Sequence, residues 1–229
     1  ISKVCKQRIY SMIDEEMFET QIAMTRLSMM SDWQELPRFN HKKMLKEIEP
    51  FKDDWKRYNP KKEGNNRWGL SVTSMDGGLS GIPDLTSLLN YQEQTGIELH
   101  NHDITEPTMV WETSEELQKV LAPWKKWVTR CHFLRLDRGG YFPEHYDINK
   151  EHFDYEEIRL VGFVNANQYD FKWCYDGKIV NGNSGELWYF NANKRHSVFS
   201  TKDGVMLLVI CLSFDKELFL KLTRSSLVK

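Results

Sequence analysis

The chain has few of the features that mark secreted or membrane proteins. Its four cysteines, at positions 5, 131, 174 and 211, are scattered and include no Cys-x-x-Cys pair. This spacing disfavours a disulfide framework and favours buried free thiols in a reducing compartment. No run approaches the roughly 18 apolar residues that a membrane span requires, and no segment resembles a signal peptide. We therefore expect a cytoplasmic protein with no membrane partner.

An excess of charge of one sign is also missing. Lys and Arg number 31 against 33 Asp and Glu, for a formal net charge of −2, which argues against a protein that binds nucleic acid over its whole surface. Only residues 38–67 are locally basic, with Trp55 and Tyr58 among the basic side chains. Acidic residues are mixed in and no binding motif is present, so we interpret this segment as a solvated helix and loop covering one end of a sheet. A nucleic-acid surface is the alternative.

Aromatic residues, by contrast, are abundant. They make up 13% of the 229 residues, and the apolar fraction is 40%. This length and apolar fraction suit one domain with a substantial core. The aromatic content is typical of aromatic-lined walls or thick sheet packing, and it does not distinguish an enzyme from a binding protein.

The apolar pattern changes from helical to strand-like along the chain. Apolar residues recur every three to four positions in residues 8–36, which predicts a helix. Residues 114–130 predict another, because Ser114 can cap it and two glutamates follow in the first turn. A short helix at 84–94 and a strand at 68–74 lie between them. Beyond Cys131, alternation and Gly, Asn and Asp turns predict seven strands, at 131–137, 141–147, 158–165, 169–175, 185–190, 196–200 and 205–214.

This order of elements indicates the fold class. Helices followed by about seven short strands fit a mainly β protein with a double-stranded β-helix of the jelly-roll or cupin type, on which the N-terminal helices pack. We expect a helical and loop extension at 1–130 and a β-helix core at 131–229, together forming one compact domain. No internal repeat interrupts this pattern.

Three residues near the ends of predicted strands have the chemistry of a metal site. His145-x-Asp147 ends the strand 141–147, and two residues apart on a strand both side chains share one face, about 7 Å apart at Cα. His196 opens a later strand. Two neutral imidazoles and one carboxylate form the facial triad of mononuclear Fe(II) oxygenases, and zinc is the alternative ion. We predict His145, Asp147 and His196 as the metal ligands and catalytic centre.

Other histidines compete for this role. A second His-x-Asp, at 152–154, lies in a charged link with no strand character, so we interpret it as a surface loop. Residues 100–106 contain a His-x-His and a later Glu like the first ligand cluster of cupins, but they lack flanking strands and lie far along the chain from His196. We therefore expect an exposed loop there. His132 opens an apolar strand, which is typical of a buried core histidine.

The segments that carry the triad resemble a known superfamily. Leu136–Asp147 is similar to the stretch of prolyl-hydroxylase-type 2-oxoglutarate- and Fe(II)-dependent dioxygenases in which a Gly-Gly turn and an aromatic residue precede His-x-Asp. Residues 157–214 look like the aspartyl/asparaginyl β-hydroxylase branch, and together the resemblance covers roughly residues 130–214. It implies Fe(II), with 2-oxoglutarate and O2 as cosubstrates. It also implies a small-molecule or peptide substrate. The group that is hydroxylated would belong to an amino acid or to a peptide side chain.

The chain departs from the pattern of this superfamily at the cosubstrate site. Many members bind the distal carboxylate of 2-oxoglutarate with a base on the closing strand, but residues 204–214 contain none. Other branches use a base on a middle strand, the place that Arg159 holds here. The resemblance therefore implies Arg159 as the 2-oxoglutarate partner, with a salt bridge to a nearby acid as the alternative. Lys172 is the second candidate.

The second departure concerns the substrate. Aspartyl/asparaginyl hydroxylases often lack the carboxylate ligand, whereas this chain has Asp147, which weakens any transfer of their substrate preference. Segments 75–82, 100–106 and 148–157 are candidate elements of the mouth of the site, because loops near an active site usually carry specificity. Two other functions fit the same residues. They are a cupin-like metalloenzyme that does not use 2-oxoglutarate and a non-catalytic jelly-roll binding module.

Overall fold

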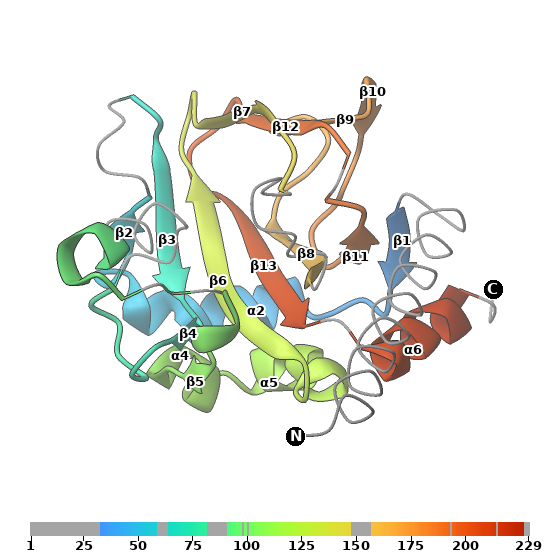
Figure 1. Ribbon diagram of the computed structural model, residues 1–229. Coiled ribbons are helices and arrows are strands. Elements are labelled where there is room, and N and C mark those ends of the chain that lie inside the picture. Colours follow the sequence, from blue (N-terminus) through green and yellow to red (C-terminus); the bar gives the residue numbers. More distant parts are fainter. Residues whose placement is uncertain are drawn as a thin grey trace.

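The structure, a computed structural model, describes residues 33–58, 64–81, 91–97, 99, 101–147, 157–192, 194–213 and 215–226. Two antiparallel sheets face each other (Figure 1). The larger has the spatial order β1 (Trp33–Leu36), β11 (Leu187–Phe190), β8 (Glu157–Asn165), β13 (Val205–Ser213), β6 (Val128–Leu136), β3 (Arg67–Ser71) and β2 (Lys56–Arg57). The smaller has the order β10 (Lys178–Val180), β9 (Phe171–Tyr175), β12 (His196–Ser200) and β7 (Tyr141–His145). The predicted double-stranded β-helix is therefore confirmed.

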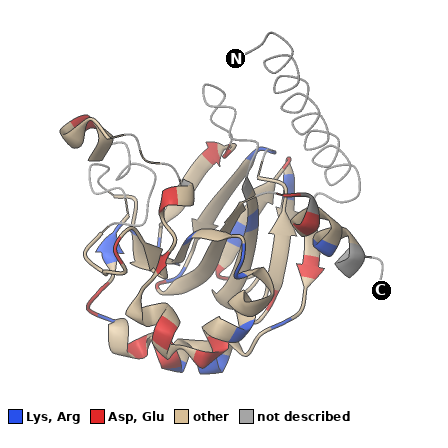
Figure 2. Cartoon of the chain, turned by 60° about the horizontal axis from the view of Figure 1, so that its bottom comes forward, with Lys and Arg blue, Asp and Glu red and all other residues tan. Residues whose placement is uncertain are grey.

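Helices cover the outer face of the larger sheet. Below that sheet in Figure 1 lie α2 (His41–Ile48), α4 (Met109–Thr113) and α5 (Glu115–Leu121), beside the short pair β4 (Thr73–Ser74) and β5 (Glu106–Pro107). Asn40 caps α2 by accepting from the Lys43 amide, and Ser114 caps α5 by accepting from the Leu117 amide, as short polar side chains do at helix starts. The outward faces of these helices carry both acidic and basic residues (Figure 2).

The described residues also form single turns of 3-10 helix, which are η1 (Glu49–Phe51), η2 (Asn101–Asp103) and η3 (Ala122–Trp124). The C-terminal helix α6 (Lys216–Ser226) packs beside the sheet and was not predicted. Asp215 starts it by accepting from the Leu218 amide at 2.7 Å and from Trp127 Nε1 at 2.8 Å. None of the described helices has the length and apolarity needed to cross a membrane.

The core is divided in two by the larger sheet. Strand β6 shows the division, because successive side chains point to opposite faces of a sheet. Cys131 and Phe133 pack with the helices in one cluster, whereas Leu134 and Leu136 pack between the two sheets in the other. The space between the sheets is therefore lined by alternate residues of β6, β8 and β13, and a cavity lies there.

Several predicted boundaries were wrong. Residues 33–36 of the predicted helix 8–36 form strand β1, and residues 8–32 lie outside the described part, as do residues 84–90 of the short helix. The helix predicted at 114–130 ends at Leu121, because Pro123 cannot supply the amide hydrogen bond that would continue it. Strand β6 already begins at Val128. Strand β10 was not predicted. Strands β1, β2 and β3 of the larger sheet come from the segment before residue 131.

Candidate metal centre

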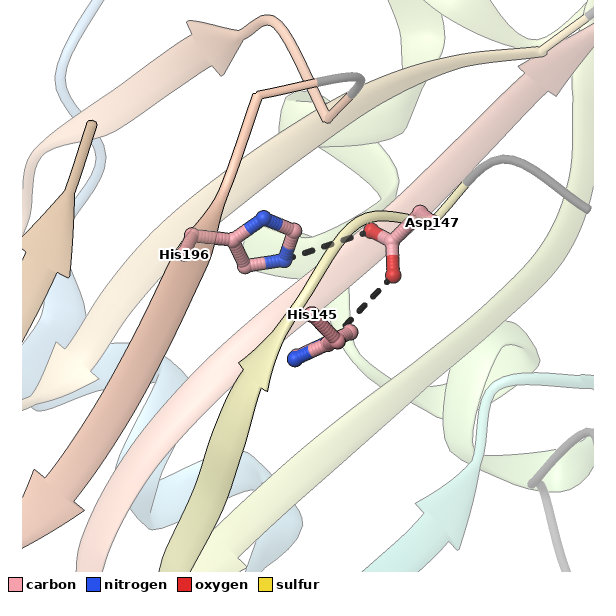
Figure 3. Close-up of side chains that lie close together, drawn as sticks. All are labelled: His145, Asp147 and His196. Atoms are coloured by element: carbon pink, nitrogen blue, oxygen red, sulfur yellow. Dashed lines mark ion pairs between the residues drawn. The ribbon is translucent and has the colours of Figure 1, made fainter.

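The structure brings His145, Asp147 and His196 together (Figure 3). Strands β7 and β12 pair antiparallel with His196 opposite His145, and Asp147 follows two residues after β7. One ligand atom from each residue lies within 4.8 Å of the others. The Nε2 atoms of His145 and His196 lie 3.3 Å and 3.5 Å from the two oxygens of the Asp147 carboxylate. The three side chains therefore face a common point, as ligands of one ion must.

Backbone carbonyls orient both imidazole rings. Nδ1 of His145 lies 2.7 Å from the Pro143 carbonyl oxygen, and Nδ1 of His196 lies 2.9 Å from that of Lys194. A carbonyl only accepts, so Nδ1 carries a hydrogen in each ring, and Nε2, on the side of Asp147, is the nitrogen that binds an ion once it has lost its proton. Two imidazole nitrogens and one carboxylate are the donor set that Fe(II) takes in facial-triad sites. The residues present fit that ion.

Asp147 is ionised despite its burial. Burial alone would raise the pKa of this carboxyl, but the Arg159 guanidinium and hydrogen bonds from His145 and His196 outweigh it and hold the pKa well below its usual range. The same carboxylate raises the pKa of His145, against the lowering effect of burial. A bound divalent ion would take the place of the proton that Asp147 draws to this imidazole.

A tight turn sets the position of the triad's first strand. Gly139 has φ of +77° and precedes Gly140 at the start of β7. A Cβ atom at Gly140 would lie 2.6 Å from the Asn66 carbonyl oxygen and 2.8 Å from that of Asp137, closer than van der Waals contact allows. Both obstacles are backbone atoms that cannot rotate aside, so only glycine fits here.

We expect Gly140→Ala to displace β7 and with it His145. The unfolding free energy should fall by about 1–3 kcal/mol, as for other overpacked sites, and Co(II) affinity should fall at least tenfold, as for lost ligand support. Urea denaturation and a Co(II) titration measure the two effects. Gly81→Ala is the matched control, because a Cβ atom there meets nothing within 4 Å. Equal behaviour of the two variants would contradict the role of the turn.

The triad opens into a cavity of about 400 Å³ between the sheets. Among the aromatic residues, Tyr141 and Trp173 line it. Phe199 instead lies 44% exposed on the smaller sheet, outside this cavity. The full lining is Tyr58, Asn65, Arg67, Arg130, His132, Leu134, Tyr141, Phe142, Pro143, His145, Asp147, Arg159, Val161, Phe171, Trp173, Phe190, His196, Val198, Leu207 and Val209.

Arg159 and Lys172, the two predicted cosubstrate partners, lie in different places. Arg159 lines the cavity, and its Nη1 donates to Asp147 Oδ2 at 2.6 Å. The acidic partner of Arg159 is therefore Asp147, a predicted metal ligand, and not an acidic residue next to Arg159 in the sequence. Lys172 points to the outer face of β9, opposite Phe171 and Trp173, and its ammonium donates to the Gln168 carbonyl. Because strand alternation turns it away from the cavity, Lys172 is withdrawn as a partner.

Two cavity residues were missed by the sequence reasoning. Arg67 and Arg130 line the cavity although each is at most 5% exposed. The sequence reasoning placed neither of them in a strand, because Arg67 precedes the predicted strand 68–74 and Arg130 ends the predicted helix 114–130. His132 is buried as predicted, but it also lines the cavity. His102 is exposed in η2, as expected of that loop, and residues 152–154 lie outside the described part.

Comparison with known proteins found similarity only to solved structures. The chain is similar to a Pseudomonas putida prolyl-4-hydroxylase (13% identity, TM-score 0.48, covering 86% of this chain and 99% of that one). It is also similar to a Burkholderia pseudomallei oxidoreductase of the 2OG-Fe(II) oxygenase family (11%, 0.47, 85% and 89%). A Streptococcus pyogenes protein of unknown function (15%, 0.29) aligns over 38% of this chain, which spans 65% of that protein's length. No family profile and no curated protein matches the chain.

Proposed function

We propose that the protein is an Fe(II)- and 2-oxoglutarate-dependent dioxygenase that hydroxylates a small-molecule or peptide substrate, on an amino acid or a peptide side chain. The observation that carries the proposal is the convergence of two imidazole Nε2 atoms and one ionised carboxylate at the wall of a cavity. Three protein ligands on one face leave positions for a cosubstrate and oxygen.

The chain's own residues position and shield the reactants. His145, Asp147 and His196 would hold the ion, and Fe(II) with 2-oxoglutarate and O2 supplies the oxidising chemistry when bound. Carbonyl hydrogen bonds fix both imidazole rings, and Arg159 keeps Asp147 ionised. The aromatic and aliphatic side chains that dominate the cavity wall limit access of water.

We further propose Arg159 as the partner of a 2-oxoglutarate carboxylate. On the closing strand β13, the residues that line the cavity are Leu207 and Val209, which offer no charge. Arg159 is the cavity base that contacts the triad directly. A guanidinium carries five N–H groups, so its bond to Asp147 is compatible with a second carboxylate.

The test of the function is conversion of 2-oxoglutarate to succinate by the Fe(II)-loaded protein in the presence of O2. We expect succinate formation that depends on both the ion and 2-oxoglutarate. Oxidation of a substrate without 2-oxoglutarate would favour the cupin-like metalloenzyme. A protein that retains no divalent ion would favour the non-catalytic binding module. Either result contradicts the proposal.

Replacing Arg159 tests its assignment. We expect Arg159→Met to raise the KM for 2-oxoglutarate at least tenfold, the effect of losing a charge-assisted hydrogen bond. Initial rates of succinate formation give KM, and a Co(II) titration separates this loss from damage to Asp147. Arg195→Met is the matched control, because Arg195 is exposed and pairs with Glu144. An unchanged KM in Arg159→Met would assign the cosubstrate to another base.

A further inference from the structure

Trp173 lies next to the triad on the inner face of the smaller sheet. Strands β9 and β12 pair so that Tyr175 lies opposite His196 and Trp173 lies opposite Val198. Residues two apart on a strand share one face, so all four side chains point to the space between the sheets. Diagonal neighbours on one face of an antiparallel pair lie about 7–8 Å apart. Trp173 is therefore the diagonal neighbour of a predicted metal ligand.

The indole N–H of Trp173 has no protein partner. The side chain is 4% exposed, and its Nε1 makes no hydrogen bond within the part of the chain that the structure describes. The hydroxyl of neighbouring Tyr175, in contrast, donates to the Asn191 carbonyl at 2.8 Å. Buried polar atoms are normally paired with protein, water or ligand, because an unpaired one costs free energy. Since Trp173 lines the cavity, a molecule in the cavity can supply the missing acceptor.

The facing wall of the cavity has the same feature. His132 on β6 of the larger sheet lines the cavity and is 2% exposed, and its Nδ1 also makes no hydrogen bond to any described residue. Burial, together with the nearby charges of Arg130 and Arg159, lowers the pKa of His132 well below its usual range, so the ring is neutral. Both walls thus offer uncharged hydrogen-bonding groups, which suit a polar occupant better than a pure hydrocarbon.

An unpaired indole N–H alone does not make a binding site. Nε1 of Trp188 likewise has no hydrogen-bond partner among the described residues. Trp188, however, packs on the Phe163 ring at 5.7 Å between centroids and is not among the residues that line the cavity. Trp173 differs because its position is on the cavity wall beside the triad. Trp188 therefore provides a matched control for it.

The surroundings of Trp173 favour an uncharged acceptor. Its ring centroid lies 5.0 Å from that of Phe190, 5.9 Å from that of Tyr175 and 6.0 Å from that of Phe163. A carboxylate among these rings would exchange its hydration for a single N–H, which is costly. An indole N–H only donates, so its partner must accept. A carbonyl or hydroxyl oxygen meets both conditions.

We propose that the substrate of this site carries an uncharged carbonyl or hydroxyl oxygen, which accepts a hydrogen bond from Nε1 of Trp173. The inference rests on the proposed dioxygenase function and names its substrate class, which includes a peptide carbonyl, a side-chain amide and an alcohol. The apolar lining, with Phe171, Val198 and Leu207, takes the hydrocarbon part. Because the hydrogen bond fixes this oxygen beside the triad, Trp173 orients the substrate and decides which carbon faces the ion.

Nuclear magnetic resonance of the indole N–H groups tests the hydrogen bond directly. The eight tryptophans are labelled with ¹⁵N in the Zn(II)-loaded protein with saturating 2-oxoglutarate. The probes are acetophenone, ethylbenzene, which lacks the oxygen, and benzoate, which is charged. We expect acetophenone to shift the indole proton of Trp173 downfield and to leave that of Trp188 in place. Ethylbenzene and benzoate should not produce this shift.

Two variants measure the contribution of the N–H to binding. We expect Trp173→Phe to reduce the preference for acetophenone over ethylbenzene about three- to tenfold, the effect of one neutral hydrogen bond. Trp188→Phe should keep the wild-type preference. Each variant also identifies its own indole signal by the loss of one peak. If Trp173→Phe does not fold, nuclear Overhauser contacts to Val198 and Phe190 assign the signal, and the wild-type measurement stands alone.

Four results would overturn the proposal. They are no shift of the Trp173 signal with acetophenone, an equal shift with ethylbenzene, a shift with benzoate alone, and an unchanged preference in a folded Trp173→Phe. A downfield shift on addition of 2-oxoglutarate, before any probe, would assign the N–H to the cosubstrate and also overturn it. Failure of the dioxygenase function appears separately, as absence of succinate from the Fe(II)-loaded wild type. The acetophenone titration without 2-oxoglutarate would then still measure the contact of Trp173.

Discussion

Replacing His196 with alanine is expected to lower succinate formation by more than about a hundredfold, because substituting even the groups that support a metal ligand costs 10- to 100-fold. His196 is 6% exposed, its ring centroid lies 4.3 Å from that of His145, and Phe190 packs edge-on against it. Alanine would leave one imidazole and one carboxylate, which come from the same end of β7. Two ligands from one segment cannot fix an ion in the facial arrangement.

Two measurements separate loss of the ion from loss of the fold. A Co(II) titration followed by visible absorption should show little binding to His196→Ala, and urea denaturation of the apo protein should show a folded variant. His145→Ala should behave in the same way. His102→Ala is the matched control, because His102 is exposed in η2 and does not belong to the triad. Wild-type Co(II) affinity in His196→Ala would refute the metal centre.

The triad was predictable because its determinants are local. His145-x-Asp147 lies at the end of a strand that its own alternation and the preceding glycines predict, and His196 opens a strand whose predicted limits match the structure. What the sequence could not supply is the pairing of β7 with β12, which sets His196 opposite His145. The resemblance to an enzyme superfamily took the place of that information.

The positions of Arg67 and Arg130 on the cavity lining could not be predicted in this way. Arg67 lies opposite Leu136 in the ladder between β3 and β6, two segments far apart in the chain. Whether a basic residue lines the cavity depends on this register, because a shift by one residue would turn it to the helix side of the sheet. Arg159 shows the same limit. Its place on an inner strand was predictable, but its contact with Asp147 was not.

The boundaries that the sequence missed have similar causes. Strand β1 has four residues and gains its extended form from pairing with Leu187–Phe190 of β11, so local pattern alone did not reveal it. Strand β10 did carry a local signal. Asp176 and Gly177 both have positive φ, 49° and 75°, and connect β9 to β10. Asp-Gly between two short strands is a frequent hairpin turn.

Replacing Phe163 with alanine is expected to lower the unfolding free energy by about 3–5 kcal/mol, the usual cost of emptying a buried aromatic position. Phe163 of β8 is fully buried between the two sheets. Its ring centroid lies 6.0 Å from that of Trp173 on the smaller sheet and 5.7 Å from that of Trp188 on the larger one. A Cβ atom at Gly182 would lie 2.2 Å from the ring, so the chain there is packed directly on it.

The same substitution should also affect the candidate metal centre, because it should change the distance between the two sheets. Trp173 packs on Phe163 and also lines the cavity, whereas the triad lies on β7 and β12 of the smaller sheet. Loss of the ring would let this sheet settle toward the larger one, because cavities in cores collapse only partly and shift their neighbours. We therefore expect weaker Co(II) binding in Phe163→Ala as well as lower stability.

Two control variants separate the effect of removing a buried ring from the effect of removing a phenylalanine as such. Phe199→Ala removes an aromatic ring of the same size from the exposed face of the smaller sheet, where it is 44% exposed, and should change stability by no more than about 0.5 kcal/mol. Phe163→Leu keeps most of the apolar volume and should cost less than about 1.5 kcal/mol. Urea denaturation of the three variants ranks their unfolding free energies. Phe163→Ala could instead lower the unfolding free energy no more than Phe199→Ala does. In that case the Phe163 ring would not set the distance between the two sheets, and the strand ladders alone would determine the width of the cavity beside the triad.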